Sequence, residues 1–349
     1  MHYTEGDFQD SARRVINYSE DIRKARELNI DSETMTNRRA SEIEKSYEEL
    51  LERFCKWAET RSDIRAAWIL GSKARVNHPA DKWSDIDIVF ITTDSYQSYL
   101  SKFDWISNFG KPLLTLIDTS TASDDKLRVV LFEGMIDVDF VPLDYEDMRK
   151  SVQWVDQMIK AGTDQDALAW IWNVYGRGVR VLVDKDGLAA TISAVAASVK
   201  KPSSRRPTQD EFMEVVYDFF YHAVWTAKHL RRGELWWTLT HCYQPLQRPL
   251  LRMIEWHALA EHGWKHDVWY LGHFLEEWAT PKTVKGLRET FAEYDEENVK
   301  RALLAAIEVF HSLALETAIE LNYSYPKETD KNVTEWIRIC ISEPSSRRQ

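Results

Sequence analysis

The sequence predicts a two-domain α+β protein, with a mixed β-sheet and flanking helices in the N-terminal half and a bundle of helices in the C-terminal part. Strand and helix patterns alternate up to about residue 199, whereas the pattern beyond residue 207 is helical nearly to the end. The length of 349 residues also suits two domains of ordinary size. We therefore expect an N-terminal extension over residues 1–40, a sheet domain over 41–199 and a helical domain over 200–341.

The elements of the sheet domain follow from their apolar patterns and turn residues. Residues 41–57 carry apolar side chains on one helical stripe, and an uninterrupted apolar run follows at 66–70, typical of a buried strand. Gly110 is a natural end for the next helix, and Glu133-Gly134 has the spacing of a hairpin turn. The predicted elements are helices over 41–57 and 96–109 and strands over 66–70, 85–91, 128–132, 135–141 and 179–183.

The helical domain begins after a stretch rich in Lys, Arg, Pro and Ser at residues 200–207, which we interpret as a linker. Apolar residues then recur at helical spacing. The sequence predicts helices over 211–231, 250–261 and 297–321.

Composition and charge exclude several classes of protein. The net charge of −11 disfavours a nucleic-acid partner, which usually binds a basic face. No run of about 18 uncharged apolar residues exists and the first residues are polar, so we expect neither a membrane span nor a signal peptide. The three cysteines form no C-x-x-C pair and indicate reduced thiols. We therefore expect a cytoplasmic protein with small-molecule partners.

The segment that carries chemistry is Gly71-Ser72 followed, after twelve residues, by Asp85-Ile86-Asp87. Because side chains alternate along a strand, Asp85 and Asp87 lie on the same face. Two ionised carboxylates at this spacing repel each other, and a divalent cation removes that penalty. Mg²⁺ suits carboxylate ligands and keeps positions open for water and phosphate. The pattern therefore predicts a magnesium site for phosphoryl transfer.

A second pair of acids, Asp137 and Asp139, occupies a later predicted strand with the same spacing. Aspartate is disfavoured in strands, so four in two short strands call for an explanation. A single D-x-D is usually a strand edge or a turn, but two of them after a strand and a Gly-Ser pair are hard to obtain by accident. We expect Asp137 and Asp139 to lie near the first pair.

Gly71 and Ser72 fit a phosphate-binding role, because a glycine permits close approach and its N–H group and a serine hydroxyl can bind phosphate oxygens. Lys73 and Arg75 add positive charge toward a triphosphate. Neither a P-loop nor a useful G-x-G-x-x-G motif is present. His262 and His266 have the spacing of zinc ligands on a helix, but Gly263 lies between them, and we interpret them as structural or surface histidines.

These motifs resemble the nucleotidyltransferase superfamily and, within it, the aminoglycoside 6-adenylyltransferases that modify streptomycin. The resemblance runs from about residue 45 to residue 340. It joins Gly71-Ser72-Lys73-Ala74 and Ile136-Asp137-Val138 to segments that carry no general signature. Those segments are 104–110, 201–203, 250–256 and 325–326, with Asn332, and the spacing of Lys228, Arg232 and Glu234.

The resemblance implies a role for each matched residue. Asp85, Asp87 and Asp137 would bind metal, and Asp137 would be a ligand or the base for the acceptor hydroxyl. Asp139 stands where the family carries a neutral residue, and its position on the same strand face makes it an alternative base. Gly71, Ser72 and Lys73 would bind the triphosphate, and Lys228 would contact it from the helical domain. An exposed helix end paired with Glu234 is the alternative for Lys228 and Arg232. The cofactor is Mg²⁺, expected as two ions, and ATP is the co-substrate.

The implied activity is transfer of AMP from ATP to a hydroxyl of a streptomycin-like aminoglycoside, with release of pyrophosphate and antibiotic resistance as the outcome. An acidic protein is compatible with such a cationic acceptor. The alternatives are another small-molecule or protein acceptor, and a nucleotide-binding module without turnover. A template-independent RNA polymerase is disfavoured by the net charge.

Overall fold

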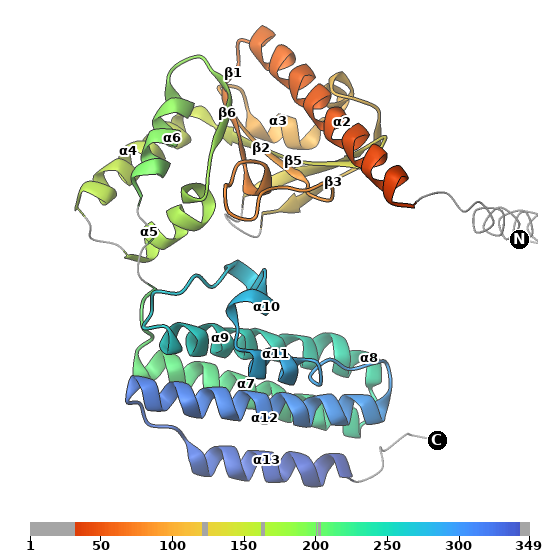
Figure 1. The fold of residues 1–349 in the computed structure, drawn as a ribbon, viewed down its shortest axis with the longest axis vertical. Coiled ribbons are helices and arrows are strands. Elements are labelled where there is room, and N and C mark those ends of the chain that lie inside the picture. The colour runs from red at the N-terminus through yellow and green to blue at the C-terminus, as the bar shows by residue number, and fades with distance from the viewer. Residues whose placement is uncertain (1–31, 121–124, 162–164, 200, 202–203, 343–349) are drawn as a thin grey trace, which may run out of the picture. The chain divides into compact units, whose positions relative to one another are not determined.

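The computed structural model describes residues 32–120, 125–161, 165–199, 201 and 204–342 (Figure 1). The chain divides into two compact units, one comprising residues 1–164 and 170–200 and the other comprising 165–169 and 201–349. The first unit contains the β-sheet and is called the sheet unit below. The second is built from helices and is called the helical unit.

Within the described residues, the sheet unit has one mixed sheet in the order β3-β4-β5-β2-β1-β6. Its strands are β1 (Ile64–Leu70), β2 (Ile86–Thr92), β3 (Pro112–Thr119), β4 (Lys126–Phe132), β5 (Ile136–Asp144) and β6 (Arg180–Asp184). The two central strands β2 and β5 run parallel, and the other neighbours are antiparallel. The mixed sheet is confirmed, and the predicted strand ends move by at most three residues.

Strand β3 is not among the strands that the sequence predicts. It lies at the edge of the sheet, begins with Pro112, and leaves Leu113, Leu114, Leu116 and Ile117 about half exposed. A proline is tolerated there because an edge strand has a free hydrogen-bonding side. The strand therefore depends on its long-range pairing with β4, which no local alternation reveals.

The two faces of the sheet have separate cores. Ile86, Ile88 and Phe90 of β2 face the helix α2 (Ser32–Thr60), whose side chains Leu50 and Phe54 are fully buried. The alternate residues of β2 and β5 face the helices α4 (Tyr145–Ala161) and α6 (Leu188–Ser198). The two D-x-D segments therefore present their aspartates to this second face.

Two helices differ from the prediction. Helix α2 begins at Ser32, inside the stretch 1–40 predicted as an extension, whereas residues 1–31 lie outside the described residues. The single helix predicted over 96–109 is wrong, because α3 (Tyr96–Ser101) stops and a 3-10 turn, η2 (Asp104–Asn108), follows. At the break, Lys102 is extended and the Trp105 indole N–H donates to its carbonyl at 2.9 Å. This break buries Trp105 among the aromatic rings of the core.

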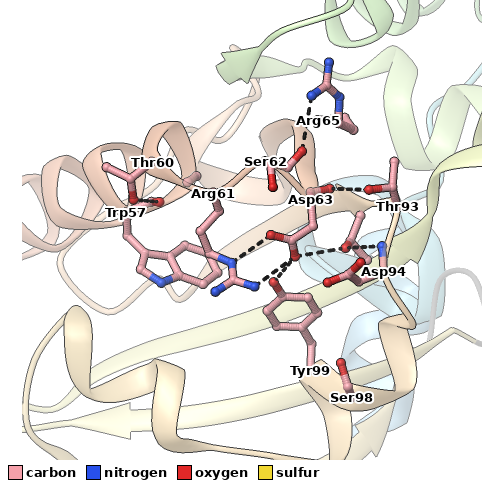
Figure 2. Close-up of polar contacts among 12 residues, drawn as sticks. Trp57, Thr60, Arg61, Ser62, Asp63, Arg65, Thr93, Asp94, Ser98 and Tyr99 are labelled. Carbon is pink, nitrogen blue, oxygen red and sulfur yellow. Dashed lines mark hydrogen bonds and ion pairs between the residues drawn. The ribbon is translucent and has the colours of Figure 1, made fainter.

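The turn between α2 and β1 is held by a buried aspartate, Asp63 (Figure 2). Arg61 donates two hydrogen bonds to its carboxylate, at 2.9 and 3.1 Å, and Tyr99 of α3 donates a third. Burial opposes ionisation of Asp63, but the bonds from Arg61 and Tyr99 outweigh it and hold its pKa below the usual value. The Thr93 N–H also donates to the Asp63 carbonyl at 2.9 Å, so this network links the start of β1 to the end of β2.

The helical unit is a bundle whose core is apolar and aromatic, with Phe219 and Phe310 stacked at 3.8 Å between ring centroids. Its described α-helices are α5 (Gln165–Ile171, in part), α7 (Gln209–Arg231), α8 (Leu235–Trp237), α9 (Gln244–Glu261), α10 (Leu275–Trp278), α11 (Pro281–Leu287), α12 (Glu296–Leu321) and α13 (Lys327–Ser342). The predicted helices 211–231 and 297–321 are confirmed. Helix α9 begins six residues before the predicted start and contains Pro249.

Two ends of the bundle helices show why they begin where they do. Thr208 and Glu211 form a capping box at the start of α7, directly after the predicted linker. The Asp295 side chain caps α12 by accepting from the Asn298 N–H at 2.9 Å. Helix α12 is long and apolar enough to span a membrane, but half of its apolar window is buried within the protein, as in the central helix of a bundle.

Candidate active site

The structure brings the four predicted aspartates together. Asp87 of β2 and Asp139 of β5 are direct partners across the parallel pair, so their side chains leave the sheet on the same face. Asp85 precedes β2 by one residue, and Asp137 is the second residue of β5, so each lies two residues before one of these partners. These four residues form an acidic cluster at the start of the two central strands.

Burial and the neighbouring carboxylates raise the pKa of three of these aspartates. Burial, together with the carboxylates of Asp85 and Asp137, raises the pKa of Asp87 to about 6 despite the opposing effect of Arg75. Burial and then the carboxylates of Asp87, Asp85 and Asp137 raise the pKa of Asp139 to about 7. Burial and the charge of Asp85 also raise the pKa of Asp137. Without a cation, this cluster therefore resists full ionisation.

The donor set fits a divalent cation. The Oδ1 atom of Asp137 is buried and has no hydrogen-bond partner in the part of the chain that the structure describes, although buried polar atoms normally have one. Among the described residues, no three His, Cys, Asp or Glu side chains are gathered closely enough to hold a metal ion as they stand. Mg²⁺ prefers oxygen ligands. Binding it would remove the repulsion between these carboxylates and would give the buried Oδ1 atom a partner.

Gly71 is required where β1 ends, because its φ is +66° and it lies against the acidic cluster. A Cβ atom at this position would lie 2.2 Å from Oδ2 of Asp87. Gly71 begins a 3-10 turn, Gly71–Lys73. The backbone N–H groups of the two residues after this turn, Ala74 and Arg75, donate to the Gly71 carbonyl. Gly71 therefore lies directly beside the second aspartate of the motif.

Ser72 and Lys73 lie on this turn, as the sequence predicts for a phosphate-binding pair. The Ser72 hydroxyl is buried without a hydrogen-bond partner among the described residues, so it has donor capacity for a ligand. The Nζ atom of Lys73 lies 4.6 Å from the ring centroid of Tyr47, a cation–π contact that holds the lysine near the turn.

Tyr47 is a site residue that sequence reasoning missed. Its place on the apolar stripe of α2 identified it only as a core residue, and it is 4% exposed. In the structure its hydroxyl accepts a hydrogen bond from the Asp137 N–H at 3.3 Å, while its ring contacts Lys73. Tyr47 therefore connects the predicted phosphate-binding lysine to the backbone of Asp137 at the start of β5.

Lys228 lies in the helical unit, on α7, and is exposed. Its Nζ atom is 5.7 Å from the ring centroid of Trp336 on α13. The predicted alternative, an ion pair with Glu234, is made by Arg232 at 2.9 Å and by His229. His262 and His266 stack on each other with ring centroids 4.2 Å apart.

We expect the stability of the metal-free protein to fall as pH rises from about 4 to about 7. The folded state raises the pKa of Asp87 to about 6 and of Asp139 to about 7, above the ordinary value of 3.8, so it binds more protons than the unfolded chain across this interval. Allowing for solvent screening of half-buried groups, the loss is about 1–2 kcal/mol. Thermal melts in a chelator at pH 5.5 and 8 measure it.

Two controls assign this effect to the acidic cluster. Asp139→Asn should flatten the pH dependence between pH 5.5 and 8, and Mg²⁺ should raise the melting temperature at pH 8 more than at pH 5.5. An Asp139→Asn protein with the same pH dependence as the parent would contradict the assignment.

Comparisons with known proteins cover both units. A family model described as streptomycin adenylyltransferase matches residues 44–339. The chain is 23% identical over 300 residues to an aminoglycoside 6-adenylyltransferase of Staphylococcus aureus, covering 83% of this chain and 96% of that protein. It is 22% identical over 304 residues to an aminoglycoside 6-adenylyltransferase of Bacillus subtilis (strain 168), covering 84% and 96%. The crystal structure of an aminoglycoside 6-adenyltransferase from Bacillus subtilis matches with a TM-score of 0.39 and 18% identity, over 84% of this chain and 98% of that one.

Proposed function

Since this chain belongs to the streptomycin adenylyltransferase family, as its motifs predict, we propose that it transfers AMP from ATP to a hydroxyl group of a streptomycin-like aminoglycoside. The observation that supports this most directly is the acidic cluster beside Gly71, where the turn after β1 begins. The modification would protect the host from the antibiotic. The net charge of −11 suits a polycationic acceptor, and we place the reaction in the cytoplasm, where ATP is available.

We assign Mg²⁺ binding to Asp85, Asp87 and Asp137, with two ions as the expected number. The raised pKa values of Asp87 and Asp137 and the unpaired Oδ1 of Asp137 support this assignment. When bound, Mg²⁺ neutralises charge on the triphosphate and on the leaving pyrophosphate.

In the proposed reaction, the acceptor oxygen forms a bond to the α-phosphorus of ATP and the bond from that phosphorus to the β-phosphate oxygen breaks. Pyrophosphate leaves with the bonding electrons, and the proton of the acceptor hydroxyl passes to a carboxylate. We assign this base to Asp137, with Asp139 as the alternative. The pKa of Asp139, raised to about 7, suits a proton acceptor at neutral pH.

We assign triphosphate binding to the turn after β1. The turn offers the backbone of Gly71, which has no Cβ atom, the unpaired Ser72 hydroxyl, and the ammonium group of Lys73. We expect Lys228 to add a further contact from the helical unit.

Tyr47→Phe should lower kcat about tenfold while leaving the KM for ATP nearly unchanged. The phenylalanine keeps the ring that contacts Lys73 but removes the hydroxyl that accepts from the Asp137 N–H, so the backbone that carries the third aspartate loses one hydrogen bond. Tyr47→Leu removes both contacts and should also raise the KM for ATP. Steady-state kinetics with varied ATP separate the two effects, and a wild-type kcat for Tyr47→Phe would contradict this role.

The experiment that tests the proposed function incubates the protein with Mg²⁺, ATP and streptomycin and follows pyrophosphate release and the mass of the drug. We expect stoichiometric pyrophosphate and a drug heavier by one adenylyl group. AMP on a protein instead of on the drug would overturn the proposal in favour of a protein acceptor. ATP binding without turnover on any aminoglycoside would overturn it in favour of a module without catalysis.

A further inference from the structure

A second positively charged segment lies against the turn after β1, although it comes a hundred residues later in the chain. This segment is Gly176-Arg177-Gly178, which follows the π-helical turn η3 (Trp172–Gly176) and precedes β6. Single π-helical turns are rare and often occur at functional sites. Along the chain, the segment connects η3 to β6 within the sheet unit.

The two glycines hold Arg177 in place because neither position has room for a side chain. A Cβ atom on Gly178 would lie 2.2 Å from the carbonyl oxygen of Ala74 and 3.1 Å from Cα of Arg75, and its φ is +146°. A Cβ atom on Gly176 would lie 2.5 Å from the ring of Trp172. The backbone around Arg177 is therefore packed directly on the backbone of the turn that begins with Gly71.

Arg177 and Arg75 line one cavity of about 170 Å³ on the face of the sheet that carries the aspartates. The same cavity is lined by Gly71 and Asp87. Pockets for whole small molecules usually measure about 300–1,000 Å³, so this cavity suits one part of a larger ligand. Its position beside Asp87 places that part next to the proposed metal ligands.

The charged residues that line the cavity are two arginines, Arg75 and Arg177, and two aspartates, Asp87 and Asp125, so it suits an anion that is bound together with a cation. Burial and the positive charge of Arg177 lower the pKa of Arg75, whereas the carboxylates of Asp85 and Asp87 oppose that shift. The two guanidinium groups therefore lie close enough to repel each other, within reach of the acidic cluster. A polyphosphate relieves this repulsion, because guanidinium groups donate strong charge-assisted hydrogen bonds to phosphate oxygens. The Arg75 Nε itself donates to the His78 carbonyl at 2.6 Å, which orients this guanidinium.

We propose that Arg177, acting with Arg75, binds the β- and γ-phosphates of ATP and holds the pyrophosphate product. The inference rests on the proposed function and extends it with a phosphate-binding residue outside the Gly71-Ser72 motif. It places the leaving group in the cavity beside Asp87, with the α-phosphate toward the four carboxylates.

Isothermal titration with inorganic pyrophosphate, with and without Mg²⁺, tests this directly and needs no acceptor. Arg177→Gln should weaken pyrophosphate binding about ten- to a hundred-fold. The affinity of Arg177→Lys should lie between those of the parent and Arg177→Gln, because lysine keeps the charge but loses the bidentate geometry. Arg149→Gln is the matched control, since Arg149 is an exposed arginine of the sheet unit paired with Glu146. It should bind pyrophosphate like the parent protein.

The result that would overturn the proposal is an Arg177→Gln protein that binds pyrophosphate as the parent does and has an unchanged KM for ATP. Circular dichroism and thermal melts establish that the variant is folded, and Arg177→Lys gives the answer if Arg177→Gln is not. AMP serves as the second titrant, because it lacks the β- and γ-phosphates and its affinity should not change. A failure to modify streptomycin would overturn the proposed acceptor and leave the pyrophosphate result standing.

Discussion

Asp87→Asn is expected to lower the rate of AMP transfer about 10³-fold or more while leaving the protein folded. The substitution removes one of the four carboxylates, a proposed metal ligand, and loss of several kcal/mol of transition-state stabilisation corresponds to at least three powers of ten in rate. Because the neighbouring carboxylates and burial raise the pKa of Asp87 to about 6, its neutral replacement should not destabilise the metal-free protein at pH 8. Single-turnover rates and thermal melts measure the two effects.

Two further variants test whether the effect belongs to the cluster. Asp85→Asn should cause a comparable loss of rate, and because Asp85 is exposed its removal should hardly alter stability. Asp94→Asn is the control, since Asp94 is an exposed aspartate just beyond the other end of β2. Its rate should equal that of the parent protein, and a similar loss in Asp94→Asn and Asp87→Asn would refute the metal assignment.

Gly71→Ala is expected to cause the second large effect, a loss of turnover of about 10²-fold or more with a modest loss of stability. The alanine would adopt a φ of +66°, which costs about 1–2 kcal/mol for a residue with a side chain. Its Cβ would also lie 2.2 Å from Oδ2 of Asp87, so that carboxylate must rotate away from the cluster. A misplaced catalytic group of this kind commonly costs about 10²-fold in rate.

Gly187→Ala separates the clash from the backbone strain. Gly187 has a similar φ of +75°, but a Cβ atom there would meet nothing within 4 Å. Both variants should lose similar stability in urea unfolding, and only Gly71→Ala should lose turnover. Equal turnover in the two variants would show that the contact with Asp87 has no catalytic consequence.

The acidic cluster that is proposed to carry the activity also lowers the stability of the metal-free protein. Four acids on one face of two adjacent strands disfavour the folded state unless a cation is bound, and the fold accommodates them because the opposite face is a continuous apolar and aromatic core. The Asp63 hydrogen-bond network joins β1 to β2 at the opposite end of these strands, and it does not depend on a cation.

Much of this organisation could be predicted from local pattern. Alternation along 85–91 and 135–141 placed each pair of aspartates on one face, and helical spacing identified α7 and α12. The family could be recognised because the Gly-Ser and D-x-D motifs occur together with segments of the helical domain. The helix predicted over 96–109 failed because the burial of Trp105, a tertiary contact, outweighed helical continuity.

By itself, the sequence determined the mixed sheet, the helical C-terminal part, the family and the four acids, because these depend on side-chain periods of two or 3.6 residues and on short motifs. Only the tertiary structure decided that β2 and β5 are neighbours in parallel register, that Tyr47 contacts Lys73 and the Asp137 N–H, and that Arg177 lies beside Arg75. Those contacts join residues from about 26 to 102 positions apart. They arise from side-chain packing and from close approach of two backbone segments, and neither produces a repeating pattern in the sequence.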